Sequence, residues 1–197
     1  MPANLGRGVG ASQASSSGTI VDGMAYFYHG IPEDMKGSEL IPLNKMLEVD
    51  ADLRAKYLEK YKGREEILER KIPLLNCLWN DVVQLLPLHP YKLFELQKEL
   101  GLIDEIPDYR YFQIPLTLLD PQQTVVYFKT APGEENVTVK WLKDVNLDEL
   151  QETPEATKQY YTSMVGTSEP VFNYQFVPHI IYRGTVDVSG AETITLR

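Results

Sequence analysis

The positions of apolar and polar residues divide the chain into a short aromatic first strand, a helical middle part and a second half rich in strands. The first strand is predicted at residues 24–29, because this aromatic run stops at Gly30 and Pro32. Runs rich in β-branched and aromatic residues, separated by turn residues, predict the later strands. We place these strands at residues 109–114, 124–130, 137–142, 172–183, 185–188 and 193–196.

Helical spacing of apolar residues is clearest between Asp50 and Arg70. Asp50 is suited to cap this helix, and Leu53, Tyr57 and Tyr61 fall on one of its faces. A glycine at position 63 would divide the stretch into two helices. The other predicted helices cover residues 90–100, 147–150 and 154–165, with Gly101 ending the first of these and Thr153 capping the last.

Residues 72–90 allow two interpretations. The apolar run over 81–86 is followed by Pro87 and Pro90, which would damage a continuous helix, and this favours a buried strand. Periodicity also fits a helix over 74–85. The order of elements predicts an α+β fold rather than a regular alternation of strands and helices. We expect a mixed or mostly antiparallel sheet, helices in the N-terminal half, and a helical insert before the C-terminal strands.

Composition refines this picture. Residues 1–23 are rich in glycine and serine and offer little apolar surface, so we predict a flexible tail. Residues 24–197 then form a single α+β domain, which suits a chain of 197 residues with 43% hydrophobic and 24% charged residues.

The formal net charge of −9 argues against generic binding to nucleic acid or to an anionic membrane. No stretch approaches the roughly 20 apolar residues of a membrane helix. The one cysteine, Cys77, lies in an apolar run, which is typical of a buried thiol in a reducing compartment. We therefore expect a cytoplasmic protein.

Candidate chemistry centres on the histidines and on one short polar motif. The spacing of His29, His89 and His179 is not that of a metal site. His29 ends the first strand beside Gly30, where a ligand could approach closely. The alternative is a half-buried histidine bonded to a backbone carbonyl.

The residues Trp79, Asn80 and Asp81 combine an aromatic ring, an amide and a carboxylate just before the apolar run. They could grip a ligand. Alternatively they cap a strand or helix, with the indole in the core, because Asn and Asp favour caps and turns.

Three short blocks resemble ADP-ribosyltransferase-like proteins, including the RNA 2′-phosphotransferases. These blocks are Tyr28-His29-Gly30 followed by the run 40–43, the run 81–86, and the closing run 178–186. The resemblance implies that His29 contacts the ADP-ribose part of NAD. The catalytic glutamate of that family has no counterpart that we can place here.

Two hypotheses follow. The first is an ADP-ribosyltransferase-like enzyme or a binder of an NAD-derived nucleotide, with Tyr28, His29, Gly30, Trp79, Asn80, Asp81 and His89 as the ligand-binding residues. It requires no cofactor, and NAD would be a substrate. The second is a non-catalytic module that binds a protein partner.

Overall fold

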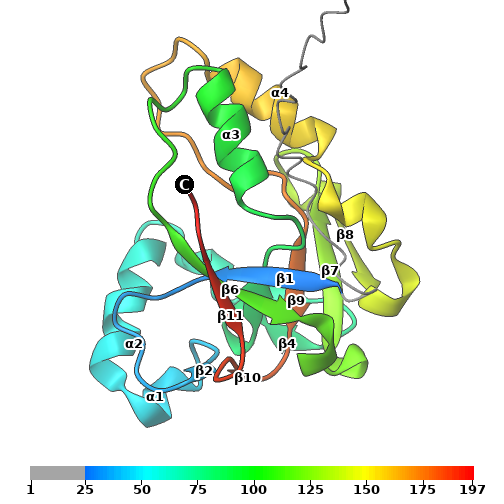
Figure 1. Ribbon diagram of the computed structural model, residues 1–197. Coiled ribbons are helices and arrows are strands. Elements are labelled where there is room, and N and C mark those ends of the chain that lie inside the picture. Colours follow the sequence, from blue (N-terminus) through cyan, green and yellow to red (C-terminus); the bar gives the residue numbers. More distant parts are fainter. Residues whose placement is uncertain (1–24) are drawn as a thin grey trace, which may run out of the picture.

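The computed structural model describes residues 25–197, and the tail predicted for residues 1–23 lies outside this range. The strands form two principal sheets (Figure 1), in which every pair is antiparallel. The first sheet has the order β1 (Tyr26–Gly30), β6 (Arg110–Pro115), β11 (Glu192–Thr195). The second has the order β5 (Val83–Leu85), β9 (His179–Tyr182), β7 (Thr124–Lys129), β8 (Val137–Trp141). Two small ribbons pair β2 (Glu39–Leu40) with β10 (Val186–Asp187), and β3 (Lys71–Ile72) with β4 (Cys77–Leu78).

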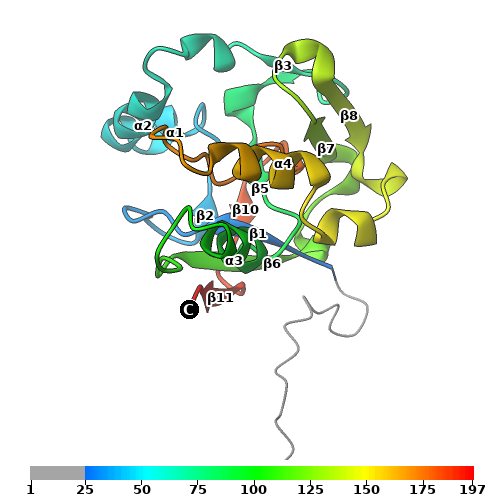
Figure 2. The same ribbon diagram turned by 90° about the horizontal axis from the view of Figure 1, so that it is seen from above.

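Most helices lie in the first half of the chain or just before β9, as predicted. The α-helices are α1 (Met46–Val49), α2 (Ala51–Leu58), α3 (Tyr91–Glu99) and α4 (Glu155–Met164). Short 3-10 turns cover Glu59–Tyr61, Glu65–Ile67, Trp79–Asp81, Leu116–Leu118, Pro121–Gln123, Glu134–Asn136, Leu142–Asp144 and Asp148–Gln151. Figures 1 and 2 show α1 and α2 together at one side of the molecule, and α3 above the sheet that contains β1. The predicted α+β fold with a mostly antiparallel sheet is therefore confirmed.

Strand alternation sorts the apolar side chains into separate clusters. In β9, Ile180 packs between the two sheets, whereas its neighbour Ile181 packs on the opposite face. In β1, Phe27 faces the space between the sheets and Tyr28 faces α3. Successive residues of a strand point to opposite sides, so one sequence run supplies two cores.

The largest cluster lies between the two sheets and also takes in the β2–β10 ribbon through Leu40 and Val186. A second cluster joins α3 to the β1 sheet through Leu93 and Phe94. The third lies on the far face of the β9 sheet, where Cys77 is buried. In the described part of the chain, no helix has the length and apolar character needed to cross a membrane.

Several predicted elements are shorter than expected. The helix over 50–70 keeps its α-helical form only to Leu58, and Gly63 adopts a φ of +79° between two 3-10 turns. The predicted strand over 172–183 is reduced to β9, because the chain turns before it, where Phe176 has a φ of +60°. Within the run 81–86 the strand covers Val83–Leu85 and Asp81 ends a 3-10 turn, which excludes the alternative helix over 74–85.

Of the residues predicted to begin or end helices, two are confirmed and one is wrong. Asp50 caps α2 by accepting a hydrogen bond from the Leu53 amide at 2.9 Å, as expected. Gly101 follows α3 with a φ of +70°, a conformation that suits glycine. Thr153 was expected to cap α4 and does not, because the helix begins after Pro154 with no side-chain cap.

The inter-sheet cluster should dominate the stability of the fold. Phe27 is fully buried there, so we expect Phe27→Ala to lower the free energy of unfolding by about 3–5 kcal/mol through lost burial and a residual cavity. The matched control is Phe172→Ala, because Phe172 is 57% exposed, and it should cost less than about 1 kcal/mol. Urea unfolding of both variants tests this, and equal losses would contradict it.

Candidate functional site

Besides the side-chain packing between them, the two sheets are linked in the described part of the chain by one backbone bridge. Tyr28 of β1 and Leu86, just after β5, exchange both backbone hydrogen bonds at 2.8 Å. Within residues 25–197 this bridge is isolated, so β1 and β5 separate immediately beyond it. In a continuous antiparallel ladder the next bonded pair would be Gly30 and Gln84. The two sheets instead diverge at that point and leave room between them.

His29 lies at the point where backbone pairing between β1 and β5 ends. Its Nδ1 is 2.8 Å from the backbone carbonyl oxygen of Gln84, and because a carbonyl only accepts, Nδ1 must donate. The imidazole thus replaces the missing backbone donor of Gly30. When Nδ1 carries the proton, the neutral ring has Nε2 as its acceptor. The bond therefore fixes both the position of the ring and its tautomer.

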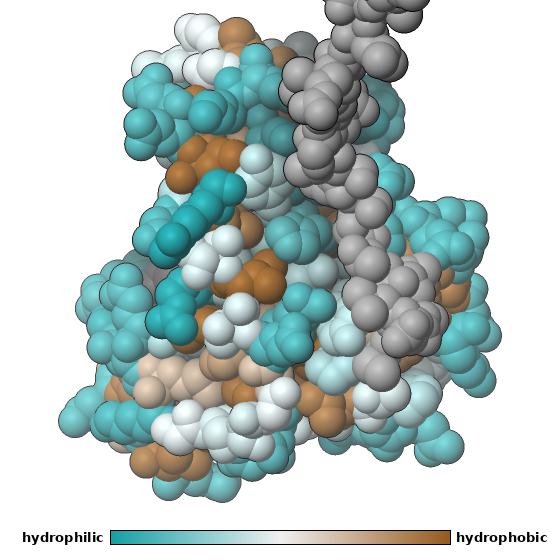
Figure 3. All heavy atoms as spheres, viewed as in Figure 1, coloured by the Kyte–Doolittle hydropathy of each residue, from teal (hydrophilic) through white to brown (hydrophobic). Residues whose placement is uncertain are grey.

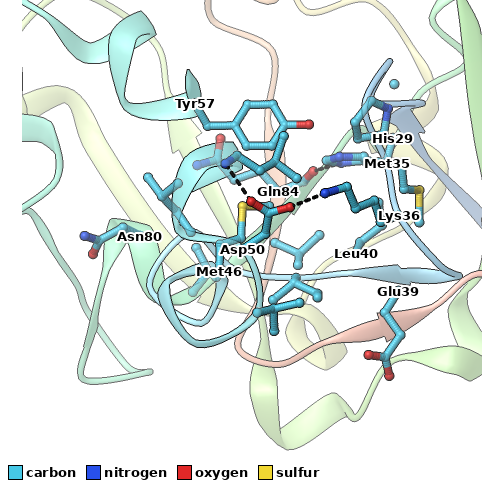
Figure 4. Close-up of a pocket in the computed structure, with 18 of the residues that line it drawn as sticks. His29, Met35, Lys36, Glu39, Leu40, Met46, Asp50, Tyr57, Asn80 and Gln84 are labelled. Atoms are coloured by element: carbon cyan, nitrogen blue, oxygen red, sulfur yellow. Dashed lines mark hydrogen bonds and ion pairs between the residues drawn. The ribbon is translucent and has the colours of Figure 1, made fainter. Parts of the chain in front are cut away.

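A cavity of about 480 Å³ opens beside this pair. This volume falls in the usual range for small-molecule sites, about 300–1,000 Å³. Figure 4 shows His29, Lys36, Asp50 and Tyr57 gathered around it. Most of its wall is apolar or aromatic, and the lining includes Pro32, Met35, Leu40, Ile41, Leu43, Met46, Val49, Leu53, Tyr57, Tyr61, Trp79, Val82 and Val83.

One side of the cavity is an aromatic wall made by Tyr57, Tyr61 and Trp79. Trp79 is fixed from behind, because the Arg70 guanidinium lies 5.7 Å from its ring centroid and Tyr127 packs edge-on at 5.1 Å. Burial raises the pKa of the Tyr57 and Tyr61 phenols. Both tyrosines therefore remain neutral at physiological pH.

An ion pair stands beside the wall. The Lys36 ammonium is 2.5 Å from a carboxylate oxygen of Asp50, and the same carboxylate caps α2. The hydrogen bond raises the pKa of Lys36 and lowers that of Asp50, so both groups stay charged near pH 7. The Lys36 side chain is 78% exposed and that of Asp50 18%, and both residues line the cavity.

The segment that carries this ion pair closes one side of the cavity. Neither α1 nor α2 contains a buried residue. The segment is attached to the rest of the domain by polar contacts, including Asn44, whose amide NH₂ donates to Asp81 at 2.5 Å and whose backbone N–H donates to the Asn80 carbonyl at 2.9 Å. The apolar side chains of α1 and α2 that face inward, among them Met46, Leu53 and Tyr57, line the cavity and are not part of the buried clusters.

The structure brings together only part of the predicted site. His29, Gly30, Trp79 and Asn80 line the cavity, although Figure 4 shows the Asn80 side chain turned away from the other labelled residues. Gly30 is not required for space, because a Cβ there would have its nearest neighbour, a Tyr111 ring carbon, at 3.8 Å.

Three predicted residues lie elsewhere. Tyr28 points to the opposite face of β1, toward α3, where burial raises its pKa to about 12. His89 contacts the ring of Tyr28 edge-on at 5.1 Å, on that same far side. The Asp81 carboxylate accepts from the Leu78 amide at 2.8 Å and from Asn44, so it holds the local turn together. For Asp81 the structure thus shows the alternative of a capping role.

Sequence reasoning missed the residues contributed by the segment 35–61. Leu53, Tyr57 and Tyr61 were predicted to share one face of a helix but were not named as site residues, and they line the cavity. A signal was present, because Leu53, Tyr57 and Leu58 are the only large apolar residues of α2, too few for an extended core contact. Lys36, Met46 and Gln84 gave no sequence signal of their own.

Among the described residues, no group of three His, Cys, Asp or Glu side chains is arranged to hold a metal ion. Two carboxylates line the cavity, those of Glu39 and Asp50. Asp50 is engaged by Lys36, and Figure 4 shows the Glu39 carboxylate directed away from His29. The geometry therefore suits binding through ring stacking, apolar contact and hydrogen bonds.

Comparisons of the chain with protein-family models, with curated proteins and with solved structures found no match.

The two histidines outside the cavity should make the fold sensitive to mild acid. Burial lowers the pKa of both His89 and His179, and the Nδ1 of His89 accepts from the Tyr91 amide at 3.3 Å, which requires an unprotonated nitrogen. The unfolded chain takes up protons first, near its ordinary pKa of about 6.5, so the free energy of unfolding should fall as the pH drops from about 7 toward 5.

Urea unfolding at a series of pH values measures this effect. The variant His89→Gln has no titrating ring at that position, so its stability should fall less steeply over the same range. A slope equal to that of the unmodified protein would show that His89 does not contribute.

Proposed function

We propose that the cavity beside His29 is a small-molecule site and that it binds the ring-bearing end of an NAD-derived nucleotide. The observation that carries this proposal is the separation of β1 and β5 beyond Tyr28. It opens an aromatic cavity at the strand end where the resemblance to ADP-ribosyltransferase-like proteins expects a ligand-contacting histidine.

The chemistry of the walls supports a flat heteroaromatic group. Tyr57 and Trp79 offer ring faces, and aromatic contacts contribute roughly 0.5–1.5 kcal/mol beyond their buried area. Met35 and Met46 supply flexible thioethers that adapt to ring edges. His29 and Gln84 contribute polar groups on the adjacent wall, and a few such groups are what orient a ligand in an otherwise apolar site.

The proposal concerns ligand binding and does not include a catalytic reaction. Ribosyl transfer develops positive charge on the sugar, which a carboxylate would have to face. In the cavity wall the Asp50 carboxylate already accepts from Lys36 and from the Leu53 amide. The contacts of Asp50 therefore support binding of the nucleotide rather than transfer of its ribosyl group.

Thermal unfolding in the presence of NAD, ADP-ribose or nicotinamide tests the proposal. A ligand that binds only the folded chain raises its stability by mass action. At a concentration about tenfold above Kd this amounts to about 1.4 kcal/mol, which corresponds to a rise in Tm of about 3–6 °C for a domain of this size.

The variant His29→Ala should lose this shift, while His89→Gln, a histidine outside the cavity, should keep it. Each variant is compared with its own ligand-free Tm, since removal of the His29 ring also removes a hydrogen bond to Gln84. The absence of a shift at millimolar concentrations of these ligands would refute the proposal.

A second function, a module that binds a protein partner, is favoured by one observation. Leu47 and Val49 of α1 are 59% and 68% exposed on a helix without buried residues, and Val49 also lines the cavity. Figure 3 shows hydrophobic side chains at the lower edge of the molecule, where Figure 1 places α1. Adjacent exposed apolar groups can mark a contact surface.

This second function makes a different prediction. A protein partner that contacts α1 should be recovered with the unmodified chain and with His29→Ala, but lost when Leu47 and Val49 are both changed to Asp. The control is Leu118→Asp, an exposed leucine on a separate 3-10 turn. Affinity purification with quantification of the recovered partner measures this, and equal recovery with all variants would contradict a contact through α1.

A further inference from the structure

We infer that the cavity takes the phosphate-free part of its ligand, a nucleoside or free heteroaromatic base, and that phosphate groups add nothing to the affinity. This inference rests on the proposed function and specifies its ligand class. It follows from the charges that line the cavity and from the capping of the N-terminus of α2 by Asp50.

The charges in the wall do not favour an anion. Among the described lining residues the one lysine is Lys36, and no arginine is present, whereas Glu39 and Asp50 supply two carboxylates. Lys36 is already bound to Asp50 at 2.5 Å. A phosphate that entered would therefore find no lysine or arginine among the described lining residues that lacks an anionic partner.

The nearest helix end is also occupied. The first turn of an α-helix presents free backbone N–H groups and commonly holds phosphate. At the start of α2 the carboxylate of Asp50 accepts from the Leu53 amide at 2.9 Å. An internal anion therefore already stands where an external one would bind.

A neutral ring meets suitable partners instead. The phenols of Tyr57 and Tyr61 stay uncharged, because burial raises their pKa. Trp79 packs against the Arg70 guanidinium and the Tyr127 ring, so contacts within the protein position its ring without a ligand. A pre-ordered aromatic wall lowers the entropy cost of binding a flat group. The cavity thus combines good contacts for a base with a lysine that is already paired to a carboxylate.

The first experiment compares ligands that differ only in their phosphates. Calorimetry on the unmodified chain would measure adenosine against AMP and ADP-ribose, and nicotinamide riboside against its 5′-phosphate and NAD. We expect each nucleoside to bind as tightly as its phosphorylated counterparts or more tightly. Raising the salt concentration should weaken none of them, because no favourable charge contact is being screened. A nucleotide that binds at least fivefold more tightly than its nucleoside would overturn the inference.

The second experiment changes the charge of the wall. Asp50→Asn keeps a good capping residue but releases Lys36, so it should strengthen binding of AMP and NAD about fivefold and leave adenosine unchanged. The matched control is Asp148→Asn, an exposed acid on a separate 3-10 turn outside the cavity wall, which should change neither. Equal changes for nucleoside and nucleotide, or equal effects of the two substitutions, would contradict the inference.

The outcomes separate the two proposals. If none of these ligands binds, the proposed function fails and the inference fails with it. If nucleotides bind and nucleosides do not, the proposed function stands and the inference about ligand class is wrong.

Discussion

The hydrogen-bonded pair of Tyr28 and Leu86 is the contact on which the arrangement of the two sheets depends. It joins them at one point, and both sheets then continue with their own partners. Beyond that point the Gln84 carbonyl would be left without a partner, a loss that costs roughly 1–3 kcal/mol when such a group is buried. The His29 ring donates to it instead. One side chain therefore compensates for the end of a ladder and at the same time forms part of a cavity wall.

The segment over the cavity shows a second constraint. Because α1 and α2 bury none of their residues, hydrophobic packing contributes little to their position. Polar links hold the segment to the rest of the domain, among them the hydrogen bonds from Asn44 to Asp81 and to the Asn80 carbonyl. A typical hydrogen bond contributes only about 0.5–1.5 kcal/mol net to stability. The apolar faces of this segment are consequently available to a ligand or partner, which is the physical basis of both proposed functions.

Much of the fold could be predicted because local rules decided it. Asp50 caps α2, Gly101 ends α3, and the prolines at 87 and 90 exclude a helix across the preceding strand. The failures occurred where tertiary contacts overrode local preference. The aromatic run from 172 to 178 has the composition of a strand, yet the chain turns there, with the Thr157 hydroxyl donating to the Gln175 carbonyl at 2.9 Å. Composition alone contains no record of such a contact.

The candidate site divides in the same way. The sequence by itself determined that His29 ends an aromatic strand, and strand alternation determined that His29 and Phe27 share a face while Tyr28 points to the other. Only the tertiary structure decided that this face opens into a cavity, because the opening depends on where β1 stops pairing with a strand more than fifty residues away. It also separated Asp81 and His89 from His29 and added Lys36, Asp50 and Tyr57. The alternation of residues along a strand predicts which side of the sheet a residue faces. The residues that it meets on that side depend on how distant segments of the chain pack.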